Sequence, residues 1–312
     1  MHRSAQPMEG LLMKLSPRPS MFFRAASYVP GSYRLVPEKL RAMYLRYLLR
    51  GKLARARGLN FLRHIEGTPL REPVGPHEAT CIMTHDIETR RGLVRALRLK
   101  LVEEKKDISS IWFVPSREFR LDRRILGRLA EGAEVGSHDL RHDGRIMFLS
   151  ESRLVERFRE SKSHIESLIE KPVRWFRAPL LQHHARMFRA LARAGYEYDS
   201  SVPTWEPAHP VVGGPYWTGL IGPIEVSGIL EVPLTLPQDH QMMHVLGLSP
   251  RETVKIWLRM ASKLTELGGI ITVLVHPDYE FADREGLKWY RRLVREIADI
   301  GEFTITPPGA RS

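Results

Sequence analysis

The stretch Glu134-Val-Gly-Ser-His-Asp-Leu-Arg-His142 carries a short β-like run through a glycine, followed by two histidines four residues apart. Imidazoles at this spacing can bind one metal ion, and zinc in a hydrolytic site takes three protein ligands and leaves a fourth position open. Alone the pair is a weak signal, since such histidines are often structural or surface residues. The stretch therefore raises the question of a third ligand and of the fold that would bring it close.

Candidates for the third ligand lie upstream, at the end of another strand-like run. Thr80-Cys-Ile-Met-Thr84 leads into His85-Asp-Ile-Glu88, which presents two carboxylates two positions apart. Side chains at this spacing on an extended segment point the same way. The carboxylates of Asp86 and Glu88 can therefore face one site together.

Strand-like and helix-like segments alternate beyond a Pro/Gly-rich break at residues 71–77. This order predicts a parallel sheet covered by helices, either an open sheet or a closed barrel, and seven or eight units favour the barrel. The expected strands cover residues 80–84, 109–114, 134–137, 173–177, 229–232, 269–275 and 303–305. The expected helices cover residues 90–104, 123–131, 150–170, 185–194, 250–267 and 284–300.

Residues suited to catalysis fall at the ends of these strands. In parallel α/β folds the active site collects at the carboxyl ends of the strands, so we expect these side chains to share one site. They are Asp86, Glu88, His138, His142, Arg177, Glu231 and His276.

The composition is that of an ordinary soluble globular protein, with 43% hydrophobic and 27% charged residues among 312. The single cysteine, Cys81, excludes an intrachain disulfide framework and weakly favours a reducing compartment. No run approaches the roughly 18 to 20 apolar residues of a membrane span, and the N-terminus lacks the apolar stretch of a secretory signal. The expected location is the cytoplasm.

The net charge of +12 is concentrated near the N-terminus, where residues 1–75 hold 14 Lys/Arg against 4 Asp/Glu. We expect residues 1–75 to be a basic extension and residues 76–312 a catalytic domain. Residues 1–36 show no clear period and are expected to be poorly ordered or wrapped on the surface. Residues 38–57 predict a basic amphipathic helix, which either lies on an anionic membrane surface, at the inner membrane face, or packs on the main domain with solvated arginines.

Four motifs follow one another along the chain: Thr-His-Asp-Ile-Glu at 84–88, Ser-His-Asp-Leu-Arg-His at 137–142, Arg-Ala-Pro-Leu at 177–180 and Leu-Val-His-Pro at 274–277. Together they resemble the motifs of the NodB-type polysaccharide deacetylases, which are metal-dependent N- and O-deacetylases. The resemblance covers about residues 78–306 and implies an α/β fold, an irregular (β/α) barrel, with the basic helical extension preceding it. The first motif departs from the family's commonest form, which has two adjacent aspartates, and resembles an Asp-x-Asp/Glu variant.

By that resemblance Asp86 is the general base and Glu88 a metal ligand, with the reverse assignment left open. A divalent transition metal, expected to be zinc, would be held by Glu88, His138 and His142. It would polarise the acyl carbonyl and acidify a water, whose proton Asp86 accepts.

The same resemblance assigns roles to three further residues. The backbone N–H of Leu180 matches the family's donor to the oxyanion, and His276 would deliver a proton to the leaving nitrogen. Arg177 would hold Asp86 ionised, the alternative being a purely structural ion pair.

A catalytic imidazole needs its second nitrogen fixed, and three acidic residues are candidates for this role. Glu231 and Asp239 would orient His276 or contact sugar hydroxyls. Asp278 is a third candidate, or a solvated loop acid.

The expected activity is a metal-dependent deacetylase that hydrolyses the N-acetyl or N-formyl amide of a sugar, in a polysaccharide or a lipid-linked glycan precursor. One alternative is a zinc peptidase, but those enzymes place a glutamate after the first histidine, where this chain has Asp139. Another is a non-catalytic protein whose basic extension binds anionic lipid or nucleic acid. No nucleic-acid motif accompanies the charge, so no nucleic-acid partner is expected.

Overall fold

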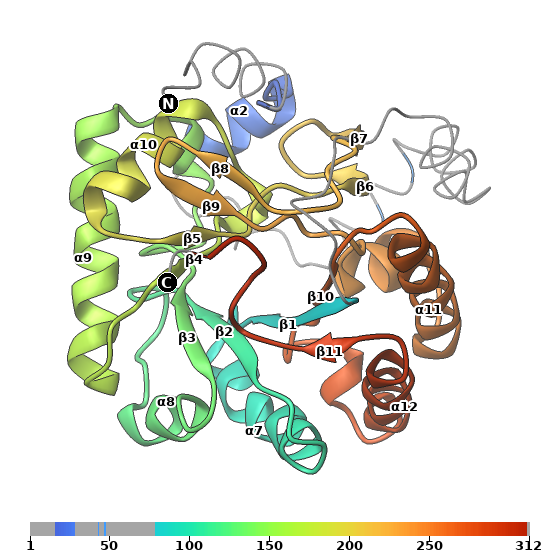
Figure 1. Cartoon of the computed structure of the whole chain (residues 1–312). Coiled ribbons are helices and arrows are strands. Elements are labelled where there is room, and N and C mark those ends of the chain that lie inside the picture. Colours follow the sequence, from blue (N-terminus) through green and yellow to red (C-terminus); the bar gives the residue numbers. More distant parts are fainter. Residues whose placement is uncertain (1–15, 29–42, 44–46, 48–78, 311–312) are drawn as a thin grey trace, which may run out of the picture.

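The computed structural model describes residues 16–28, Met43, Tyr47 and residues 79–310 (Figure 1). Its main sheet has nine strands in the order β10-β1-β2-β3-β4-β5-β9-β8, with β11 also paired to β1. All neighbours run parallel except β8 and β9, which are antiparallel. The strands are β1 (Thr80–Asp86), β2 (Ser110–Val114), β3 (Glu134–Ser137), β4 (Trp175–Phe176), β5 (Tyr198–Asp199), β8 (Ile224–Val226), β9 (Ile229–Glu231), β10 (Ile271–Leu274) and β11 (Glu302–Phe303).

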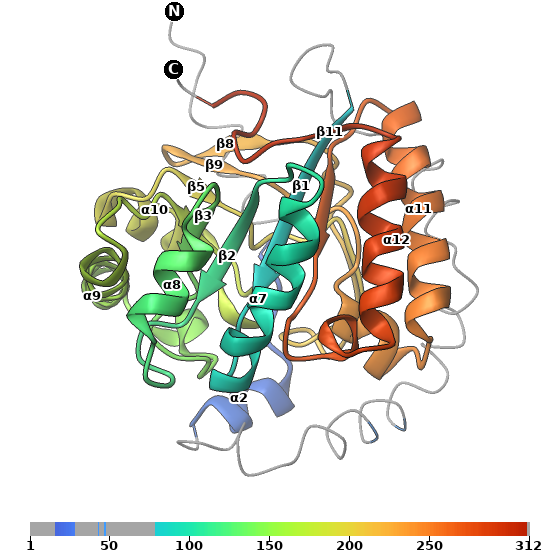
Figure 2. The ribbon, with the colours of Figure 1, turned by 90° about the horizontal axis from the view of Figure 1, so that it is seen from below.

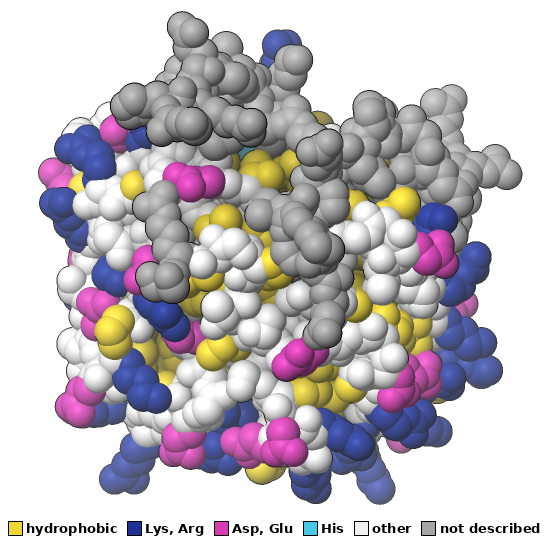
Figure 3. Space-filling model, in the orientation of Figure 1, with side chains coloured by type: hydrophobic (Ala, Val, Ile, Leu, Met, Phe, Trp, Pro, Cys, Tyr) yellow, Lys and Arg dark blue, Asp and Glu magenta, His cyan; other side chains and the backbone are white. Residues whose placement is uncertain are grey.

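Within residues 79–310, six α-helices lie around this sheet, and Figures 1 and 2 show them on its outer side. They are α7 (Arg90–Glu104), α8 (Arg123–Leu129), α9 (Glu151–Ile169), α10 (Ala185–Ala194), α11 (Pro250–Glu266) and α12 (Gly286–Ala298). The side chains of Thr89, Ser150 and Ser249 accept backbone N–H groups and so begin α7, α9 and α11. Charged side chains lie mostly along the periphery in Figure 3, since each helix turns its apolar face to the sheet.

Alternate residues of the strands enter two different apolar clusters. Trp112 of β2 belongs to the large core under the helices, whereas its neighbours Ile111 and Phe113 pack with Trp175 and Ile82 in a smaller cluster. Successive side chains of a strand point to opposite faces, so the smaller cluster fills the concave inner side of the sheet. The sheet is therefore curled around its own core.

The two ends of the curled sheet are joined by a few hydrogen bonds and not by regular strand pairing. The chain beyond β9 reaches β10, where Leu236 N–H donates to the Thr272 carbonyl at 3.2 Å and Thr272 N–H donates to Thr235 Oγ1 at 2.8 Å. The predicted α/β fold with an irregular barrel is thus confirmed, in the form of a curled half-barrel.

Some elements were not expected from the sequence. The Pro/Gly-rich region after β5 contains an antiparallel hairpin, β6 (Trp205–His209) and β7 (Gly214–Trp217). Residues 21–28 form the helix α2 (Met21–Tyr28), although no periodic pattern predicts it. Phe23 of α2 is buried and stacks on Phe148, with ring centroids 6.0 Å apart. Figure 2 shows α2 at the end of the sheet toward which β2 points.

Most of the basic extension expected over residues 1–75 lies outside the described residues, and so does the helix expected over 38–57 apart from Met43 and Tyr47. Those two residues are helical and exposed. The domain boundary near residue 76 stays a prediction. Among the helices that the structure describes, none combines the length and apolar character needed to cross a membrane.

Candidate metal and catalytic site

The parallel strands bring the sequence motifs to one edge of the sheet. Asp86 is the last residue of β1, His138 follows β3, Arg177 follows β4, and His276 lies two residues beyond β10. These strands are close in the order β10-β1-β2-β3-β4, so their carboxyl ends meet. Side chains separated by up to 190 positions in the chain therefore share one site.

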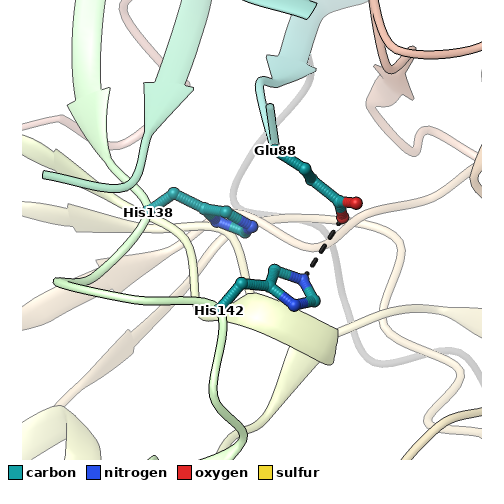
Figure 4. Close-up of side chains that lie close together, drawn as sticks. All are labelled: Glu88, His138 and His142. Atoms are coloured by element: carbon teal, nitrogen blue, oxygen red, sulfur yellow. Dashed lines mark ion pairs between the residues drawn. The ribbon is translucent and has the colours of Figure 1, made fainter. Parts of the chain in front are cut away.

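Glu88, His138 and His142 form a group that can hold a metal ion (Figure 4). One donor atom of each lies within 4.8 Å of the donor atoms of the other two. Glu88 Oε1 is 3.2 Å from His142 Nε2, the ion pair dashed in Figure 4. One carboxylate and two imidazoles are a ligand set that suits zinc and other divalent transition metals.

His138 carries the most direct sign of a missing ligand. Its Nδ1 lies 2.9 Å from the carbonyl oxygen of Arg177, which can only accept, so Nδ1 carries the proton. Its buried Nε2 has no hydrogen-bond partner among the described residues. Burial lowers the pKa of His138 to about 4, against the opposing charge of Asp86, so the imidazole is neutral. A lone pair is therefore exposed to the site, as metal ligation requires.

Glu88 and His142 hold each other charged. Burial disfavours the Glu88 carboxylate, but the charge and hydrogen bond of His142 outweigh it and keep the Glu88 pKa well below its usual value. Burial likewise opposes the His142 cation, yet Glu88 raises the pKa of His142. Both side chains face the same position, and a metal ion that bound there would have to displace the proton that lies between them.

Arg177 is fully buried and all its hydrogen bonds run to fixed partners. Nη1 donates to Asp86 Oδ1 at 3.2 Å and to Thr84 Oγ1 at 2.8 Å. Nε and Nη2 donate to the carbonyl and hydroxyl oxygens of Ser200, both at 2.7 Å. The guanidinium lies 4.5 Å from the ring centroid of Phe113. This fork presents a permanent positive charge to Asp86.

Gly136, in the stretch 134–142, makes room for the aromatic ring on which Arg177 lies. A Cβ on Gly136 would lie 2.6 Å from the ring of Phe113, closer than side chains pack. Only glycine at this position leaves room for the Phe113 ring to lie over β3, and Arg177 in turn lies over that ring.

His276 is fixed at two points by Asp239. Nδ1 lies 2.5 Å from Asp239 Oδ1, and the backbone N–H of His276 donates to Oδ2 at 2.8 Å. Burial opposes the imidazolium, but Asp239 outweighs it, helped by Glu88 and Asp86, and raises the pKa of His276 to about 10. Nε2 lies 3.7 Å from Glu88 Oε1, so a protonated imidazole faces the site.

Glu231, the other sequence candidate for orienting His276, lies elsewhere. It is opposite Asp199 in the pairing of β5 with β9, and its Oε1 accepts the N–H of Val202 at 3.0 Å. Burial and the Asp199 carboxylate raise the pKa of Glu231 well above its usual value. Among the described hydrogen bonds, none joins Glu231 to His276.

Leu180 lies in a strained turn directly after Arg177. The turn Pro179–Leu181 gives Leu180 a φ of 61° and Leu181 a φ of 51°, in the left-handed region that non-glycine residues avoid. Such backbone costs on the order of 1–3 kcal/mol per residue and tends to occur at functional sites. The strain is consistent with a backbone that is shaped to present a particular N–H group.

The geometry disfavours the zinc peptidase alternative. His138 and His142 lie on a loop after β3 and not on a helix. Asp139, between them, has a φ of 66°, and both its carboxylate oxygens accept Arg157 Nε at 2.8 and 2.9 Å. A carboxylate paired in this way is turned from the metal ligands and is not placed as a base.

Sequence reasoning missed several residues that shape the site. Thr84 and Ser200 hold Arg177, and Tyr279 Oη lies 3.4 Å from Glu88 Oε2. Asp278 was the third sequence candidate for orienting His276, but among the described hydrogen bonds it accepts the backbone N–H of Glu88 at 3.0 Å and makes none to His276. For Tyr279 the available signal was adjacency, since it lies two residues beyond the motif that contains His276.

Comparisons with known proteins show a similar sequence family and similar folds. Residues 83–198 match the sequence model of the family described as polysaccharide deacetylase. A comparison with curated proteins gave no match. A candidate polysaccharide deacetylase from Mycobacterium smegmatis has a similar structure, with a TM-score of 0.59, 15% identity and coverage of 74% of this chain and 87% of that one.

Two further solved structures share the fold. Puue allantoinase matches with a TM-score of 0.57 and 13% identity, over 78% of this chain and 92% of its own. A family 4 carbohydrate esterase from Streptomyces lividans, in complex with acetate, matches with a TM-score of 0.50 and 12% identity, over 76% of this chain and 98% of its own. At these identities the likeness supports the fold.

Proposed function

The chain belongs to the polysaccharide deacetylase family, and from this membership we propose that it is a metal-dependent hydrolase that removes the acetyl or formyl group from an N-acylated sugar. One observation carries the proposal: the donor atoms of Glu88, His138 and His142 converge, with Asp86 and His276 beside them. The sugar belongs to a polysaccharide or a lipid-linked glycan precursor.

A divalent metal bound by Glu88, His138 and His142 would supply Lewis acidity, which polarises the acyl carbonyl and lowers the pKa of a water. Zinc suits this ligand set best. His138 offers the lone pair of a neutral Nε2, and its protonated Nδ1 is fixed by the Arg177 carbonyl.

Asp86 acts as the general base and takes a proton from the attacking water. Its Oδ2 lies 3.9 Å from His138 Nε2, so it borders the position of the ligands, while its Oδ1 faces Arg177 at 3.2 Å. This contact with the buried guanidinium fixes the orientation of the carboxylate and leaves Oδ2 directed toward the ligands.

Attack by water converts the planar amide carbon into a tetrahedral one with a negatively charged oxygen. The backbone N–H of Leu180 stabilises that charge. His276 then donates a proton from Nε2 to the nitrogen, because an amine leaves readily only when protonated. The C–N bond breaks, and the products are a free carboxylic acid and an amino sugar.

The test uses the full-length protein loaded with Zn²⁺, Co²⁺, Ni²⁺ or Fe²⁺ in separate preparations. N-acetylated and N-formylated oligosaccharides serve as substrates, and released acetate and formate are measured. We expect release that depends on one bound metal per chain and is lost in Asp86→Asn while metal binding persists. Undiminished release by Asp86→Asn, or a wild-type protein that binds no stoichiometric transition metal, would refute the mechanism.

The peptidase alternative is tested with the same preparations and a mixture of unmodified peptides. We expect no new amino termini, because Asp139, the residue after His138, is paired with Arg157 and is not placed to act as a base. Peptide cleavage that disappears with the metal would favour the alternative.

The basic extension supports a substrate carried on an anionic surface. Residues 1–75 hold most of the excess positive charge, and we propose that they bring the protein to the cytoplasmic face of a membrane. Salt-sensitive cosedimentation with vesicles containing anionic lipid, absent with neutral vesicles, is the expected result. Equal cosedimentation with both kinds of vesicle would contradict it.

A further inference from the structure

The loop that follows His276 reaches across to the metal ligand Glu88. The Asp278 carboxylate accepts the backbone N–H of Glu88 through Oδ2 at 3.0 Å, and its Oδ1 accepts the Thr89 hydroxyl. Glu88 and Thr89 connect β1 to α7, so Asp278 fixes the turn on which the ligand sits. The loops that carry the proposed acid and the proposed ligand are therefore joined.

The first turn of α7 leaves room for this contact. A Cβ on Gly92 would lie 2.2 Å from Asp278 Oδ2 and 2.4 Å from Cγ. Any larger residue at position 92 would displace the carboxylate from the turn. The close approach of Asp278 to α7 therefore depends on glycine at this position.

Arg95 of α7 anchors the same loop from behind. Its side chain is buried, and Nη1 donates to the Asp278 carbonyl at 2.7 Å. Nη2 donates to the Tyr279 carbonyl at 2.5 Å and to Asp283 Oδ1 at 2.7 Å. The backbone of the loop is therefore held rigidly relative to the helix that Glu88 precedes.

Tyr279 contacts the Glu88 side chain itself. Its Oη donates to Glu88 Oε2 at 3.4 Å, while Oε1 of the same carboxylate faces His142 at 3.2 Å and His276 at 3.7 Å. The Tyr279 ring also packs beside the His276 ring, with centroids 5.1 Å apart. One oxygen of Glu88 is thus assigned to the tyrosine, and the other faces the two imidazoles.

We propose that Asp278 and Tyr279 are positioning residues that hold Glu88 for metal binding through Oε1, Asp278 acting on its backbone and Tyr279 on its carboxylate. The proposal rests on the proposed function, because it assumes that Glu88 is a ligand. A glutamate ligand needs such positioning partners more than an aspartate ligand does. Glutamate has one more rotatable bond than aspartate, so ordering it for a metal costs more entropy unless other groups hold it. Partners behind a ligand commonly change metal affinity by about 10- to 100-fold.

The experiment measures Zn²⁺ affinity of the full-length, chelator-stripped protein by competition with a chromophoric chelator. The variants are Tyr279→Phe, Asp278→Asn and Asp283→Asn, the last being the matched control. Asp283 lies on the same loop and pairs with the same Arg95, but its described hydrogen bonds do not include Glu88. We expect roughly 10-fold or larger losses for the first two and less than about 3-fold for the control.

A double-mutant cycle distinguishes positioning from general damage to the fold. In Glu88→Asp the shorter side chain cannot keep its contact with the tyrosine, so adding Tyr279→Phe should leave the affinity unchanged. The assigned role of Tyr279 would be overturned if Tyr279→Phe lowered the Zn²⁺ affinity equally in wild type and in Glu88→Asp. The proposal would also be overturned if the single variants Tyr279→Phe and Asp278→Asn each bound Zn²⁺ with wild-type affinity. Either result leaves the proposed function intact, whereas a wild-type protein that binds no Zn²⁺ overturns both.

Discussion

Asp239 meets His276 through both of its carboxylate oxygens, one on the imidazole Nδ1 at 2.5 Å and one on the backbone N–H at 2.8 Å. The pair is buried, so water does not compete for either contact. Because Nδ1 is occupied, Nε2 is the atom left to face Glu88, 3.7 Å away. The carboxylate therefore fixes both the orientation of the ring and the nitrogen that can act on a substrate.

Replacement of Asp239 by asparagine should impair proton donation and spare metal binding. An amide can keep a hydrogen bond to Nδ1 but does not stabilise the imidazolium, so we expect the pKa of His276 to fall and kcat to drop by roughly 10²- to 10⁴-fold. Steady-state kinetics with metal analysis of the same samples checks this. A variant with full metal content and wild-type kcat would show that the charge of Asp239 is not needed for proton donation by His276.

His138→Gln should abolish the response of the protein to metal. Wild-type protein should gain stability with added Zn²⁺, by about 2.7 kcal/mol when the free metal exceeds the Kd 100-fold. The variant lacks the neutral imidazole Nε2 and should show little gain. Thermal unfolding with and without Zn²⁺ measures both proteins, and His164→Gln, on the outer helix α9, is the control. Equal gains in all three proteins would exclude His138 as a ligand.

Much of the fold could be predicted from local patterns in the sequence. The apolar run 80–84 precedes an amphipathic segment, and the apolar run 269–275 follows one. Both were predicted to be strands, and the structure has β1 and β10 there. Short elements carried no such signal. The strand β5 has two residues, and the closing contact of Leu236 with Thr272 joins a loop to a strand, so neither produces a period along the chain.

The sequence predicted which residues lie in the site when they follow the ends of strands. It did not predict contacts that depend on the direction in which a side chain points. Glu231 and Asp239 were equivalent candidates, because the sequence does not show which carboxylate turns toward His276. The structure pairs Glu231 with Asp199 across two strands and Asp239 with His276. The contact of Tyr279 with Glu88 joins residues 191 positions apart, and only the folded sheet brings them together.

Arg177→Lys should destabilise the protein as well as slow the reaction. A lysine cannot replace three guanidinium nitrogens that bind Asp86, Thr84 and Ser200, and it leaves buried acceptors unpaired. We expect a loss of about 3 kcal/mol in the free energy of unfolding, measured with urea in the presence of chelator. Exposed Arg186→Lys should cost less than about 0.5 kcal/mol. Similar losses in both variants would contradict the structural role of the fork.

His184 should make stability depend on pH independently of metal. Its Nδ1 accepts the Met187 N–H at 3.1 Å, its Nε2 lies 3.1 Å from the Ile146 carbonyl, and burial lowers its pKa to about 4. A depressed histidine pKa stabilises the fold above the unfolded pKa of about 6.5, and this contribution of about 3 kcal/mol is lost toward pH 4. His184→Asn keeps a helix-capping oxygen but does not titrate. In urea unfolding, the free energy of unfolding of the wild type should fall relative to that of the variant as the pH is lowered from about 6.5 to 4. A difference that does not change with pH would contradict a neutral, buried His184.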